Sequence, residues 1–87
     1  MSRFAKALEK IRRNPKAVRF DELDAILMRL GFAKRQRGRH ATYSRSGRMM
    51  TIPHPHGQPF VLPIYVRHVL ALLDDIEAED GELSDEG

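Results

Sequence analysis

The segment from residue 34 to residue 40 has the residue types that acid–base chemistry on a phosphate ester requires. It reads Lys-Arg-Gln-Arg-Gly-Arg-His and ends in His40. An imidazole titrates at about pH 6.5, so it can give or take a proton near neutral pH. Arginine and lysine bind phosphate oxygens, and a glycine lets its backbone N–H approach one closely. The segment therefore predicts proton transfer by His40 beside a bound phosphate.

RNA is the substrate class that this chemistry suits. A base removes the proton of a ribose 2′-hydroxyl, the oxygen attacks the adjacent phosphorus, and a cation stabilises the phosphorane charge. The candidate RNA ligands around His40 are Lys34, Arg35, Arg37, Gly38 and Arg39. Tyr43 is a further candidate because its ring can stack on a base, although a packing role is equally open. A lone histidine in a basic segment also has a structural or solvent-facing interpretation.

Two more histidines lie in the loop that reads Pro-His-Pro-His-Gly over residues 53–57. Either His54 or His56 is a candidate for the general acid opposite His40, and His54 is also a candidate RNA ligand. The His-x-His spacing raises the alternative of a metal site. However, the chain has no cysteine and the acids are remote in sequence, so we expect neither a metal nor a cofactor. Nucleotide-binding glycine loops and the G-x-S-x-G sequence of hydrolases are missing.

The charge pattern favours a polyanionic partner. Residues 1–73 contain all 15 Lys and Arg and four acids, a net charge of +11, whereas the other eight acids fall in residues 74–87. A body this basic attracts nucleic acid by counterion release. The lack of cysteine and of any apolar stretch of about 20 residues predicts a cytoplasmic protein that does not enter the membrane.

The hydrophobic spacing predicts the elements that must position these side chains. Helices are expected over 3–13 and near 21–30, and a last helix should begin near Pro63. Three short strands are expected over 32–36, 40–44 and 48–52, with turns at Arg37-Gly38 and Ser46-Gly47. The order α-α-β-β-β-α predicts an α+β domain. In it, helices cover one face of a three-stranded antiparallel sheet, and the other face stays free to bind.

A single domain is expected over residues 1–78. Its core should span residues 18–76, with residues 1–14 as an additional N-terminal helix. Acids are unfavourable near the C-terminus of a helix, so residues 79–87 are expected to form an acidic, disordered tail.

Four short motifs follow one another in a characteristic order. They are Leu30-Gly31-Phe32, Gly38-Arg39-His40, the stretch from Thr51 to Gly57, and the segment from Tyr65 to Leu70. In this order and spacing they resemble the HicA-type toxins of bacterial type II toxin–antitoxin modules. The resemblance covers about residues 18–74.

The resemblance implies a double-stranded-RNA-binding-like fold with an α-β-β-β-α core, to which this chain adds its N-terminal helix. It also implies a toxin that cleaves mRNA without a metal and is blocked by a HicB-type antitoxin protein. The family's catalytic histidine corresponds to His40, and the histidine of its Pro-x-Pro-His-Gly motif corresponds to His56.

Arg39 stands where many members of that family have serine. The substitution leaves two interpretations, loss of activity or a stronger phosphate ligand. A non-catalytic RNA-binding module, or an inactivated toxin-like domain, is therefore the alternative function. A protein-interaction domain that binds an acidic partner is the third.

Overall fold

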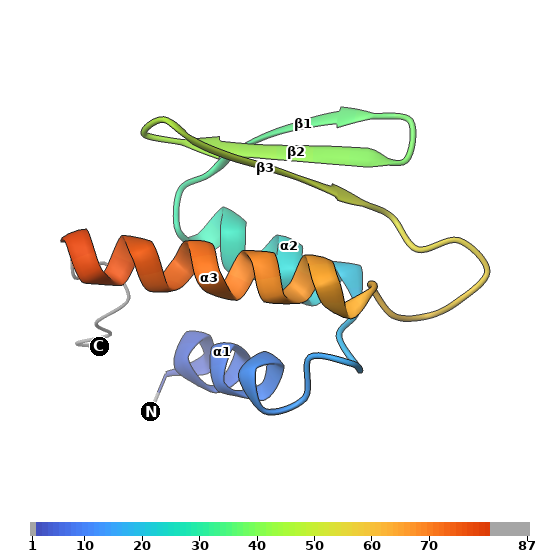
Figure 1. Cartoon of the computed structure of the whole chain (residues 1–87), viewed down its shortest axis with the longest axis horizontal. Helices are drawn as coiled ribbons and strands as arrows, with labels where there is room; N and C mark the ends of the chain where they lie inside the picture. The colour runs from blue at the N-terminus through green and yellow to red at the C-terminus, as the bar shows by residue number, and fades with distance from the viewer. Residues whose placement is uncertain (1, 81–87) are drawn as a thin grey trace.

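The computed structural model describes residues 2–80, which form three helices and three strands (Figure 1). The elements are α1 Arg3–Arg13, α2 Phe20–Arg29, β1 Ala33–Arg37, β2 His40–Arg45, β3 Arg48–Pro53 and α3 Pro63–Asp80. This α+β order is the one that the hydrophobic spacing predicts.

Local signals in the sequence explain where the first two helices begin and end. The side-chain oxygen of Ser2 accepts a hydrogen bond from the backbone N–H of Ala5, at 3.1 Å, and so caps α1. The carboxylate of Glu22 accepts the backbone N–H of Arg19, at 2.8 Å, at the start of α2. Gly31 follows α2 with a φ of 86°, a left-handed conformation that ends the helix and turns the chain into β1.

The strands form one antiparallel sheet in the order β1-β2-β3. Arg37 pairs with His40 across the first turn, so that turn consists of Gly38 and Arg39. Gly38 has a φ of 55°, and a positive φ at only the first of two turn residues is typical of a type II′ hairpin. The turn therefore lies one residue later than the predicted Arg37-Gly38, because the glycine occupies its first position. As a result, Arg37 belongs to β1.

The sheet has one covered face and one open face. Along β2 the buried residues Ala41 and Tyr43 alternate with His40, Thr42 and Ser44 on the other face. Helices α2 and α3 lie against the covered face, and α1 lies on the far side of these two helices (Figure 1). The buried core joins all three layers and includes Ile11, Leu23, Leu27, Tyr43, Ile52, Val66, Val69 and Leu73. We call the uncovered side the open face.

Helix α3 continues to Asp80, two residues beyond the predicted end of the domain at residue 78. Two long-range ion pairs hold this acidic end. Arg48 donates a hydrogen bond to Glu79, and Arg12 donates one to Asp74 at 2.7 Å. These cations offset the unfavourable position of acids near a helix C-terminus. The remainder of the expected tail, residues 81–87, lies outside the described residues.

Among residues 2–80, none of the helices combines the length and the apolar character that crossing a lipid bilayer requires.

Candidate nucleic-acid interface

His40 is the first residue of β2 and lies on the open face. Its cross-strand neighbours are Arg37 on β1 and Pro53 on β3, and residues paired across strands share a face of the sheet. The side chain is exposed, and no side chain within residues 2–80 hydrogen-bonds to it. The exposed imidazole is therefore open to a ligand, on the same face as the side chain of Arg37.

Three exposed arginines lie on the same side of the molecule as His40. Arg37 and Arg35 project from β1 toward the open face, and Arg39 occupies the turn. None of the three forms an ion pair with the described residues. Residues 33–53 contain no Asp or Glu, so no acid of the sheet itself neutralises them. This arrangement attracts anions to His40.

Gly38 gives the turn beside His40 its shape. A Cβ added to Gly38 would meet no atom within 4 Å, so the φ of 55°, and not space, favours glycine there. Its carbonyl oxygen accepts a hydrogen bond from Nε2 of Gln36, at 3.0 Å. The hydrogen bond from Gln36 thus holds the turn, whose residues Gly38 and Arg39 remain exposed to solvent.

Lys34 projects from β1 toward the covered side of the sheet, because its cross-strand neighbour is the buried Tyr43. Its role as an RNA ligand stays a prediction. Neighbouring residues of a strand point to opposite faces, and Arg35 takes the open one. The Lys34 ammonium is 2.9 Å from Oδ1 of Asp24 and lies over the rings of Phe20 and Tyr43, at 5.6 and 5.9 Å from their centroids. In this position Lys34 neutralises the half-buried carboxylate of Asp24.

Asp24 is the centre of this polar cluster. Burial raises the pKa of Asp24, but the hydrogen bonds from Lys34 and Tyr43 outweigh burial and leave the pKa below its ordinary value. The folded state therefore favours the ionised form of the Asp24 carboxyl group.

Tyr43 has no exposed surface, so the hypothesis that it stacks on a base is wrong and the packing alternative holds. Its hydroxyl donates a hydrogen bond to Oδ1 of Asp24, at 2.6 Å. Burial, together with the Asp24 charge, raises the pKa of the Tyr43 hydroxyl. A buried tyrosine that has such a partner anchors the sheet to α2.

His54 has a packing role in this structure. Its ring stacks on Phe20 with the centroids 3.6 Å apart, and its Nε2 is 3.4 Å from Oε1 of Gln36. Its backbone N–H donates to the carbonyl oxygen of Arg39, at 2.6 Å. These contacts hold the loop after β3 against the turn that precedes His40.

His56 is exposed in that same loop. It follows Pro53, the cross-strand neighbour of His40, by three residues, so its Cα lies at most about 10 Å from that of Pro53. No hydrogen bond joins the imidazoles of His40 and His56 within the described chain. The loop thus keeps His56 near the end of the sheet where His40 lies.

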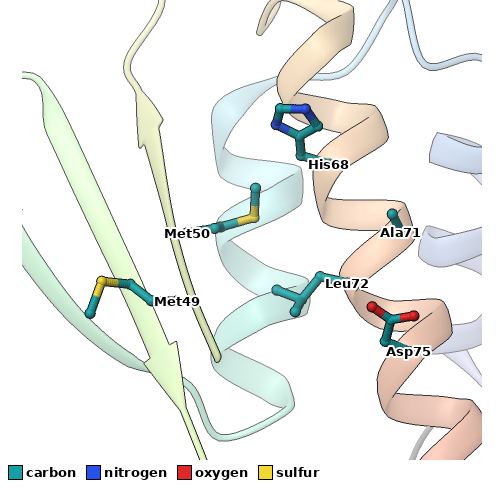
Figure 2. A pocket seen from close by; sticks show the side chains of 6 residues that line it. All are labelled: Met49, Met50, His68, Ala71, Leu72 and Asp75. Atoms are coloured by element: carbon teal, nitrogen blue, oxygen red, sulfur yellow. The ribbon is translucent and has the colours of Figure 1, made fainter. Parts of the chain in front are cut away.

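Two hollows adjoin the sheet. One, of about 320 Å³, lies between β3 and α3 and is lined by Met49, Met50, His68, Ala71, Leu72 and Asp75. Figure 2 shows Met50 reaching toward α3 and Met49 pointing away from that helix. The Asp75 carboxylate makes this hollow unsuitable for a phosphate group.

The other hollow, of about 380 Å³, lies on the open face and is lined by Ala33, Lys34, Arg35, Thr42, Ser44 and Met49. Sequence reasoning missed Ser44 and Met49. The pairing register of the strands could have identified them, because Ser44 pairs with Met49 and lies on the same side of β2 as His40.

In residues 2–80, no three His, Asp or Glu side chains are grouped closely enough to hold a metal ion. In the comparisons with known proteins, no family model, no curated protein and no solved structure matches this chain.

Proposed function

We propose that this chain is a HicA-like toxin that cleaves mRNA without a metal ion and uses His40 as its acid/base group. The observation that supports the proposal most is the position of His40. It is exposed beside Arg37 on a sheet face that has several arginines and no acid. A motif order that resembles the HicA-type toxins is the second, independent support.

The proposed reaction needs one base, one acid and one cation. A ring nitrogen of His40 takes the proton of the ribose 2′-hydroxyl, and the 2′-oxygen forms a bond to phosphorus. The bond from phosphorus to the 5′-oxygen breaks, and His56 is the candidate that returns a proton to the leaving oxygen. Arg37 lies where its charge can stabilise the phosphorane. The products are a 2′,3′-cyclic phosphate and a 5′-hydroxyl.

Arg39 has a role in this proposal as a phosphate ligand. It is exposed in the turn next to His40 and has no acidic partner among the described residues. A guanidinium group binds phosphate through two parallel hydrogen bonds, which a serine hydroxyl cannot do. The difference from the family pattern therefore strengthens substrate binding in this chain.

The partners in this proposal are mRNA and a HicB-type antitoxin protein, and the cytoplasm is where the two would meet the toxin. An antitoxin that covers the open face would bury His40 and the arginines together. A covering surface with acidic side chains would complement their charge.

A non-catalytic RNA-binding module is the second candidate, and one observation favours it. A catalytic imidazole is usually oriented by a hydrogen bond to its second nitrogen. No side chain within residues 2–80 supplies that bond to His40. In that case RNA would bind with an affinity that falls steeply with salt, and no RNA would be cut.

Growth of bacteria that express the chain tests the toxin proposal. We expect the wild type to stop growth and His40→Ala to restore it at an equal protein level. His68→Ala is the matched control, because His68 is also exposed but belongs to α3 and not to the open face. The control should remain toxic. Equal toxicity of His40→Ala and the wild type would remove His40 from the mechanism.

A further inference from the structure

We propose that the open-face hollow beside Met49 is a nucleotide subsite for single-stranded RNA. It would receive the base and phosphate of a nucleotide near the one that is cut. This inference rests on the proposed function, since it assigns a second binding position to the same RNA. The inference is based on the residues that line this one hollow. They include an exposed methionine, Met49, the hydroxyl residues Thr42 and Ser44, and Arg35.

The pairing register connects the hollow with His40. On the open face, Arg35 lies opposite Thr42, and Ser44 lies between Ala33 and Met49. Ser44 and His40 are four residues apart on β2, or about 13 Å at the usual rise of a strand. The hollow thus lies on the same face of the sheet as His40, but it is too far along the strand to hold the reacting phosphate.

Met49 supplies a surface for a base. Met49 is 70% exposed, whereas Met50, the next residue, is partly buried and packs against the core. A thioether side chain is flexible and polarizable and makes favourable contacts with flat aromatic rings. Met49 is a large apolar side chain that stays uncovered on an otherwise polar face, so it is a suitable position for contact with a base.

Polar groups around Met49 suit the remainder of a nucleotide. The hydroxyls of Thr42 and Thr51 are 2.9 Å apart and share one hydrogen bond, so one of them retains a free donor. Ser44 follows Thr42 by two residues on β2 and lies on the same face of the sheet. Arg35 borders the same hollow and has no acidic partner in the described chain, so it is available to a phosphate.

The lining of the hollow favours RNA over a protein as the occupant. The hollow has no acidic lining residue, and the apolar contribution comes mainly from one side chain, Met49, and not from a contiguous patch. The hollow between β3 and α3 differs in both respects, because it contains Asp75 and several apolar residues. A single strand is required, since only an unstacked base exposes a ring face to Met49.

Methyl NMR on the wild-type chain with ¹³C-labelled methionine methyl groups tests the inference. The probe is a short single-stranded RNA with 2′-O-methyl groups, which cannot be cut by 2′-hydroxyl attack. We expect the methyl signal of Met49 to shift and that of Met28, which is exposed on α2, to stay in place. A duplex of the same sequence should leave Met49 unchanged.

The affinity of two matched variants gives the second readout. Met49→Ala should weaken binding of this RNA by about 2- to 10-fold, the usual range for sulfur–ring contacts. Met28→Ala should not weaken it. RNA binding with no Met49 shift and no loss of affinity in Met49→Ala would overturn the subsite and leave the nuclease proposal standing.

Other outcomes separate the two proposals. A Met49 shift without cleavage of ordinary RNA would support the subsite and contradict the nuclease function. No RNA binding at all would overturn both. A Met49 signal that responds to a poly-glutamate peptide and not to RNA would overturn the subsite in favour of a protein-docking surface.

Discussion

His40 and Arg37 form the last cross-strand pair beside the first turn, and both lie on the open face. The pair is adjacent to the exposed turn of Gly38 and Arg39, so a phosphate can approach it without displacing any helix. In the proposed mechanism the imidazole of His40 is the base and the guanidinium group of Arg37 stabilises the charge that 2′-hydroxyl attack develops.

Replacing Arg37 tests its proposed role in stabilising the charge of the phosphorane. We expect Arg37→Gln to lower kcat for RNA cleavage by about 100- to 1,000-fold, because the phosphorane charge loses the cation on the cross-strand neighbour of His40. The effect on KM should be smaller, since Arg35 and Arg39 still attract the RNA. Arg67→Gln is the control, because Arg67 is an exposed arginine on α3. An equal loss in both variants would mean that only overall charge matters.

The salt dependence of RNA affinity tests whether Arg35 contacts a phosphate. We expect Arg35→Gln to reduce the slope of log affinity against log salt by about 1, the change for one lost phosphate contact. Arg67→Gln should leave that slope unchanged. A slope that is the same in Arg35→Gln as in the wild type would place the RNA away from β1.

The pH dependence of stability tests the Asp24 cluster. The folded-state pKa of Asp24 is lowered, so the ionised carboxylate stabilises the fold above the unfolded value of about 3.9. This contribution is lost as the pH falls below about 4 and through the lowered folded-state pKa.

We therefore expect Asp24→Asn to lower the free energy of unfolding at pH 7 by about 1–3 kcal/mol, and by less at pH 3. Urea unfolding from pH 3 to pH 7 measures this difference. Asp21→Asn, at an exposed position of α2, is the control and should have a smaller effect. A deficit in Asp24→Asn that does not change with pH would contradict the role of the ionised carboxylate.

Removal of the Tyr43 hydroxyl distinguishes packing from base stacking. We expect Tyr43→Phe to lower the free energy of unfolding by about 1–2 kcal/mol, since Asp24 loses a buried hydrogen bond. RNA affinity should remain unchanged, because the ring has no exposed surface. Denaturant unfolding and RNA titration of the same variant provide both values. A loss of RNA affinity without a loss of stability would indicate a binding role for Tyr43.

Periodicity predicts the fold well because local rules govern it. Apolar spacing places the helices, and the alternation along β2 separates His40 from Ala41 and Tyr43. The sequence does not reveal that the first turn begins at Gly38, and a register error of one residue changes which side chains share a face. For that reason Lys34 looks equivalent to Arg35 in the sequence, although the two lie on opposite faces of the sheet.

Contacts between distant residues are the part that the sequence does not predict. His54 stacks on Phe20, and Glu79 pairs with Arg48, and neither pair has a local signal. The same limit applies to Met49, because the run Arg-Met-Met-Thr does not show which methionine is exposed. Packing between elements decides that, and it leaves Met49 on the open face.

Digestion of single-stranded RNA in the presence of EDTA, by the wild type and by His40→Ala, tests the central claim most directly. We expect only the wild type to cut, leaving 2′,3′-cyclic phosphate or 3′-phosphate ends and 5′-hydroxyl ends. Equal cutting by His40→Ala, or binding by the wild type without any cutting, would contradict a metal-independent nuclease that depends on His40.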